Sequence, residues 1–167
     1  MQTDPHLYVD ADACPVKSEA VKVAERHGLP VTFVANAWMS LPRAARVRMQ
    51  VVTGAFDAAD DWIVEQLAPA DIVITADIPL ASRALQKGAR VLGPSGKPFT
   101  ADNIGNALAT RELMSDLRAY GVGGGPPPFG PRDRSRFLDA LELVVREARR
   151  DRASLAPAQP RQPPLAT

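Results

Sequence analysis

The sequence is poor in the side chains that build disulfide frameworks and zinc sites. Of its 167 residues, one is a cysteine and two are histidines. A single cysteine, Cys14, cannot form an internal disulfide, and it excludes a zinc site made of several cysteines. Any metal site in this chain would therefore depend on other ligands.

Long apolar runs and a large excess of one charge are also missing. No charge-free apolar stretch is long enough to span a bilayer. Residues 1–6 contain no Lys or Arg, so they do not have the pattern of a signal peptide. We therefore expect a cytoplasmic protein with no membrane partner. The formal net charge of +1 does not by itself indicate nucleic-acid binding.

Short apolar runs alternate with helical patterns along the chain, and its length favours a single domain. This alternation predicts a parallel α/β sheet with helices on both faces and further helices at the C-terminal end. The expected strands are 7–9, 31–34, 49–52, 72–75 and 90–92. The expected helices are 16–26, 41–48, 57–67, 79–87, 100–120 and 133–150. We expect the domain to cover residues 1–152, and residues 153–167, dominated by Pro, Ala and Gln, to form a disordered tail.

Two of the expected strands end in aspartate. The motif VDADACP over residues 9–15 places Asp10 and Asp12 at the end of the first apolar run. The apolar run 72–76 ends in the same way at Asp77. Open α/β sheets bind ligands beyond the carboxyl ends of their strands, so we expect these acids to face one crevice.

Clustered carboxylates repel one another, and a divalent cation is the usual remedy. Asp60 and Asp61 fall in the first turn of the expected helix 57–67 and could supply a further ligand. Mg²⁺ prefers a few carboxylates plus waters, and a pair of such ions can activate water and stabilise the leaving oxygen of a phosphodiester. The same acids also fit as helix caps, Asp57 and Asp60 for one helix and Asp77 for the next.

The longer motifs resemble the YaiI/YqxD family of bacterial proteins. The resemblance covers about residues 7–150 and is only general between residues 38 and 50. Its motifs are VDADACP (9–15), AN (35–36), FDxADxxIV (56–64), DIVITADIPLA (71–81), RxLMxxLR (111–118) and RDRxxF (132–137).

That family is grouped by similarity with the PIN-like nuclease domains, and the resemblance implies their three-layer fold. It implies a five-stranded parallel sheet in the order 3-2-1-4-5 and an acidic site for Mg²⁺ or Mn²⁺. The implied ligands and catalytic groups are Asp10 after the first strand, Asp60 at a middle helix, Asp77 in a Thr-x-Asp motif, and Asp12, the family's own second acid.

Candidate substrate contacts surround these acids. Thr75 precedes Asp77 in the Thr-x-Asp motif. Arg83 and Lys87 follow on the next helix, where they could meet a phosphate backbone or simply form a solvated face. Arg111 and Arg118 lie in the matching C-terminal motif and suit phosphate binding, although an ion pair with a neighbouring acid is as plausible.

Aromatic residues offer a second kind of contact. Trp38 and Trp62 could stack on bases, although Trp62, beside Ile63, fits core packing better.

These observations lead to a hypothesis of a metal-dependent nuclease, with RNA favoured over DNA as the nucleic-acid partner. One alternative is an aspartyl-phosphate phosphatase with Asp10 as nucleophile. Another is a non-catalytic module that binds a metal or a protein partner.

Overall fold

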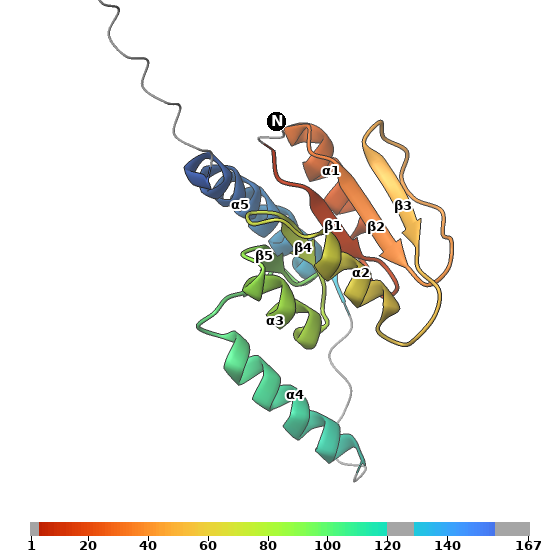
Figure 1. The fold of residues 1–167 in the computed structure, drawn as a ribbon, viewed down its shortest axis with the longest axis vertical. Coiled ribbons are helices and arrows are strands. Elements are labelled where there is room, and N and C mark those ends of the chain that lie inside the picture. The colour runs from red at the N-terminus through yellow and green to blue at the C-terminus, as the bar shows by residue number, and fades with distance from the viewer. Residues whose placement is uncertain (1–3, 120–128, 156–167) are drawn as a thin grey trace, which may run out of the picture.

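The computed structural model describes residues 4–119 and 129–155, with residues 112–119 described as backbone only. Its centre is a six-stranded sheet in the order β3-β2-β1-β4-β5-β6 (Figure 1). The first five strands are parallel, and β6 runs antiparallel to β5. The strands are β1 (Leu7–Asp10), β2 (Val31–Ala35), β3 (Val47–Val51), β4 (Ile72–Ile74), β5 (Arg90–Leu92) and β6 (Pro98–Phe99).

The five parallel strands confirm the predicted order 3-2-1-4-5, and β6 extends it at one edge. The sequence analysis did not foresee β6, because residues 94–98 carry two prolines and a glycine and were interpreted as a loop. A tight turn bridges the two strands, in which the Gly93 amide donates to the Lys97 carbonyl at 2.8 Å. Pro98 is tolerated in β6 because this short strand lies at the edge of the sheet.

Helices cover both faces of the sheet and make the predicted three layers. The helices are α1 (Lys17–His27), α2 (Ala58–Gln66), α3 (Ile78–Gln86), α4 (Ile104–Ala119) and α5 (Pro131–Leu155). α1 and α5 pack together on one face, while α2 and α3 pack on the other. α4 contacts α3 and extends away from the sheet (Figure 1).

Successive residues of the strands pack alternately into two separate apolar clusters. Leu7, Val9 and Phe33 pack toward α1 and α5, where Phe137 and Leu141 of α5 are fully buried. The intervening positions on the same strands face α2 and α3. This second cluster contains Tyr8, Val34 and Val73 from the strands, Ile63 from α2 and Leu80 from α3. Burial of each large apolar side chain contributes about 1.5–3 kcal/mol, so the two clusters hold the three layers together.

The predicted helix over 41–48 is wrong. No helix occurs between β2 and β3, and the strand begins at Val47. Pro42 would fall in the first turn of that helix, where proline is tolerated, so it does not by itself exclude the helix. Val47 instead pairs with Val31, and the rest of β3 continues that parallel register.

The boundary of the C-terminal tail also needs correction. α5 continues to Leu155, so residues 153–155 belong to the helix rather than to the predicted tail. No proline occurs between Pro131 and Pro157 to end the helix earlier. Residues 156–167, the rest of the predicted tail, lie outside the described residues. Among the described helices, none combines the length and apolar character of a membrane span.

Candidate functional site

Two of the predicted acids are joined through one buried threonine. Asp10 ends β1, and Thr75 follows the neighbouring strand β4. The Thr75 hydroxyl donates to Asp10 Oδ2 at 2.8 Å and accepts from the Asp77 amide at 2.9 Å. Thr75 is only 2% exposed, so these bonds are shielded from water. Thr75 therefore fixes Asp10 and Asp77 at the same edge of the sheet.

Asp77 is both a helix cap and a member of this edge. It is the N-cap of α3, where its Oδ1 accepts from the Leu80 amide at 2.9 Å. The capping interpretation is therefore confirmed. A cap uses one carboxylate oxygen, and Asp77 Oδ2 has no hydrogen bond to a described residue. The capping bond holds the side chain in place and leaves that second oxygen available for a ligand.

Asp60 brings a third carboxylate from the start of α2. It lies in the first turn of α2 and is half-buried. Burial, together with the charges of Asp77, Asp10 and Asp57, raises the pKa of Asp60 to about 6, although Arg83 opposes the shift. The carboxylates of Asp60, Asp77 and Asp10 therefore influence one another electrostatically.

The pKa of Asp10 is raised in the same way. Burial is the main cause, and the negative charges of Asp77 and Asp12 add to it, while the hydrogen bond from Thr75 lowers the pKa. Repulsion between carboxylates stores free energy that a bound cation would release.

Asp12 has a different hydrogen-bond partner from the other acids. It is exposed, and both of its carboxylate oxygens accept from the backbone amide of Asn36 at 3.2 Å. Asn36 directly follows β2, so this contact ties the turn after β1 to the loop after β2. The bond from Asn36 was not foreseen, although Asn36 lies in a motif that the family resemblance includes.

A pocket of about 210 Å³ opens beside Asp10 and Asp77. Its other lining residues are Ala13, Cys14, Ile74, Thr75, Ala76 and Pro94. Cys14 is buried, and burial raises the pKa of its thiol, so at neutral pH it stays a protonated thiol rather than a nucleophile.

The acids do not form a closed cage. In residues 4–119 and 129–155, no three Asp, Glu, His or Cys side chains are placed to hold one metal ion together. Two carboxylates with a free oxygen each still fit Mg²⁺, which usually keeps several waters and takes only one or two protein carboxylates. The oxygen-only donor set at Asp10 and Asp77 therefore suits a hard, partly hydrated cation.

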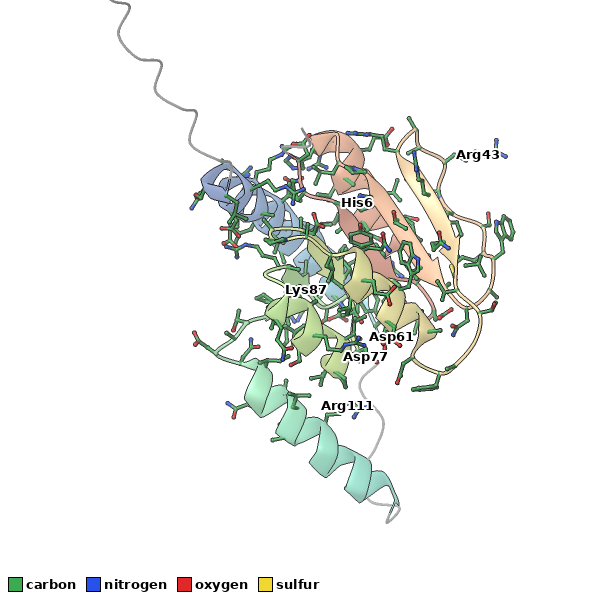
Figure 2. All side chains as sticks on the ribbon, in the orientation of Figure 1. His6, Arg43, Asp61, Asp77, Lys87 and Arg111 are labelled. Carbon is green, nitrogen blue, oxygen red and sulfur yellow. The ribbon has the colours of Figure 1, made fainter. Side chains whose placement is uncertain are left out.

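The predicted basic contacts lie apart from the pocket. Arg83 pairs with Asp61 of α2 at 2.8 Å. Lys87 follows the last residue of α3, at the end opposite to Asp77, and Figure 2 shows this separation. Arg111 is exposed on α4, and the side chain of Arg118 lies outside the described residues. In the described structure, none of these basic groups forms a hydrogen bond or ion pair with Asp10 or Asp77.

Comparison with known proteins assigns the chain to a family. The family model described as "Uncharacterized BCR, YaiI/YqxD family" matches residues 8–147, which include every acid discussed above. The chain belongs to the YaiI/YqxD family. This confirms the resemblance that the sequence motifs indicated, and the description of the family names no activity.

Bacterial relatives match the YaiI/YqxD chain over almost its whole length. A UPF0178 protein of Brucella ovis is 57% identical over 150 residues, which cover 87% of this chain and 93% of the relative. A UPF0178 protein of Rhodopseudomonas palustris is 56% identical over 154 residues, covering 92% and 93%. No solved structure matches the chain.

Proposed function

We propose that this YaiI/YqxD protein is a metal-dependent nuclease of PIN-like type that hydrolyses phosphodiester bonds, in RNA rather than DNA. The observation that carries the proposal is the Asp10–Thr75–Asp77 hydrogen-bond chain, with the carboxylate of Asp60 in electrostatic contact with it. Three elements thus bring carboxylates to the carboxyl edge of a parallel sheet, where α/β proteins bind their ligands.

The fold supports the PIN-like part of the proposal. The parallel strands have the order 3-2-1-4-5 that the resemblance implies. The acids follow the same pattern, with Asp10 after β1, Asp60 at the start of α2 and Asp77 after β4. The antiparallel strand β6 lies at the far edge from β3 and leaves this pattern unchanged.

Each residue has a distinct part in the proposed site. Asp10 and Asp77 would hold Mg²⁺ or Mn²⁺, each through the oxygen that Thr75 and the Leu80 amide leave free. The ion would activate water and stabilise the leaving oxygen of the phosphodiester. Thr75 orients Asp10, and Asp60 adds negative charge that favours a cation.

A paired substitution tests this function. In Asp10→Asn with Asp77→Asn, we expect Mn²⁺-dependent cleavage of single-stranded RNA to fall more than about 100-fold, because direct ligands matter more than the groups that orient them. Asparagine also caps helices well, so α3 keeps its start and the domain stays folded. The measurement is cleavage rate with circular dichroism on the same samples.

Asp61→Asn is the matched control, because Asp61 is exposed and pairs with Arg83 outside the pocket. This control should cleave at a rate close to that of the wild type. Absence of cleavage by the wild-type protein with every divalent metal tried would overturn the proposal.

The two alternatives give different results in related assays. A phosphatase would form a phosphoaspartate at Asp10, yet no lysine pairs with Asp10 among the described residues. A non-catalytic module would bind Mn²⁺ without turning over nucleic acid or phosphoesters.

A further inference from the structure

Two strongly exposed aromatic side chains lie in the chain segment between β2 and α2. Phe56 is 98% exposed and Trp38 is 74% exposed, whereas large apolar side chains are normally buried. The described residues include five exposed large hydrophobic side chains, and Trp38, Val51 and Phe56 account for three of them. These three lie within one segment that runs from the end of β2 to the start of α2.

The backbone connects this segment directly to the acids. Trp38 lies two residues after Asn36, whose amide is held by the carboxylate of Asp12. Phe56 lies four residues before Asp60, in the loop that enters α2. Because β2 and β3 are parallel neighbours, their carboxyl ends meet at one edge. Both aromatic residues therefore lie in loops that leave the same edge of the sheet as the acidic pocket.

Phe56 is exposed in the loop between β3 and α2. Gly54 adopts a φ of 138°, a conformation that side chains other than glycine rarely take. Asp57 stands at the N-cap position of α2 but makes no side-chain capping bond, and Phe56 lies between the glycine turn and this helix start. Together with Trp38 and Val51, which are exposed in the same segment, this ring is available for contact with a partner.

The charge of this segment identifies the kind of partner. Residues 36–56 contain three arginines, Arg43, Arg46 and Arg48, and no acidic residue. Arg43 and Arg48 are exposed, and neither pairs with an acid in the described structure, while Arg46 donates to the Gly28 carbonyl. Figure 2 shows Arg43 beside one end of β3, with Asp61 and Asp77 toward the other end.

We propose that Trp38 and Phe56 form a stacking surface for the bases of an unpaired nucleic-acid strand, with Arg43 and Arg48 contacting its phosphates along β3. Aromatic rings beside cations are the combination that binds single strands without sequence preference. Only the statement that the bound strand is a substrate rests on the proposed nuclease function. The binding of the strand to this surface does not depend on it. The surface selects unpaired over paired strands, because paired bases cannot stack on the rings.

Binding without cleavage tests the surface. The probe is a fluorescein-labelled oligouridylate of about 12 nucleotides, measured by anisotropy with EDTA present so that the strand stays intact. Trp38→Ala and Phe56→Ala should each weaken binding about 5-fold to 100-fold, the range expected for loss of one stacked base. A deoxy strand of matched sequence measures how far the surface separates DNA from RNA, and a duplex of the same length should bind much more weakly than either.

Two further measurements report on the contacts themselves. In Trp62→Phe, the remaining tryptophan emission comes from Trp38 and should be quenched by the oligonucleotide. In Arg43→Gln with Arg48→Gln, the slope of log affinity against log salt should fall by about 0.7 for each lost phosphate contact.

Matched controls come from α5, away from this surface. Leu143→Ala removes an apolar side chain that is 55% exposed, and Arg150→Gln removes an exposed arginine. Both should bind the oligonucleotide as the wild type does.

The inference is overturned if Trp38→Ala and Phe56→Ala bind the strand like the wild type. It is also overturned if they change only the sedimentation of the protein, which would make the rings a contact between two copies of the chain. If binding depends on the two rings but the protein cleaves no RNA with any divalent metal, the binding surface is supported and the nuclease function is refuted. Cleavage that is unchanged in both alanine variants would sustain the nuclease and refute the surface.

Discussion

At the scale of single residues, the carboxylates at the sheet edge have two roles at once. Asp77 caps α3, and it also lines the pocket that it shares with Asp10. From the sequence, a cap and a ligand were alternative interpretations of the same aspartate. The structure makes them compatible, because a cap needs only one oxygen of the two.

The pKa of Asp60 leads to a prediction about stability. In the folded protein this pKa is about 6, above the ordinary value of 3.8, so folding favours the protonated form. The resulting stabilisation is complete below pH of about 4 and is lost as pH rises through about 6. Asp60→Asn should remove this loss and raise the free energy of unfolding near neutral pH by about 1 kcal/mol, a value reduced for solvent screening.

Urea unfolding in EDTA, over pH of about 4 to 8, measures the difference. The curves for wild type and Asp60→Asn should diverge as pH rises. Parallel curves would show that burial and the neighbouring charges do not raise the pKa of Asp60 in the folded protein.

At the scale of elements, α5 is fixed to the sheet at two places. Arg90 of β5 pairs with Glu147 at 2.6 Å and with Asp151 at 2.7 Å. At the other end, the turn after β5 lies against the backbone of α5 at Arg136. A Cβ on Gly96 in this turn would lie 2.7 Å from the Arg136 carbonyl carbon, and the φ of Gly96 is +88°.

Gly96→Ala should therefore destabilise the protein by about 1–3 kcal/mol, because both the backbone conformation and the contact with α5 oppose a side chain. Gly105→Ala is the matched control, since a Cβ at Gly105 meets no atom within 4 Å. Gly105 lies in helix α4, where alanine is favoured over glycine by about 1 kcal/mol. Urea unfolding of both variants gives the comparison, and equal stability of Gly96→Ala and wild type would contradict the tight approach.

The elements also show where sequence patterns were sufficient. The run 72–76 is bounded by Asp71 and Asp77, and β4 was predicted within it to within one residue. The segment 41–48 contains apolar residues at a helical spacing, but pairing with β2 makes residues 47–51 a strand. β6 has two residues and forms through the turn at Gly93 and Lys97, which no periodicity reveals.

At the scale of the whole molecule, the parallel sheet brings distant residues to one edge. Asp10, Asp60 and Asp77 are far apart in sequence and come to one edge because β1 and β4 end there and α2 begins there. The sequence predicted this meeting from the position of each acid after a strand or at a helix start. It did not predict that Asp12 faces Asn36 or that Arg83 pairs with Asp61, because long side chains find partners only once the layers are packed.

A crystal of the protein soaked in Mn²⁺ tests the central claim most directly, through the anomalous scattering of the metal. The account predicts a peak within coordination distance of the carboxylates of Asp10 and Asp77, and no such peak in the Asp10→Asn, Asp77→Asn protein. Peaks found only elsewhere on the surface, or none at all, would contradict the claim that this edge of the sheet is a metal site.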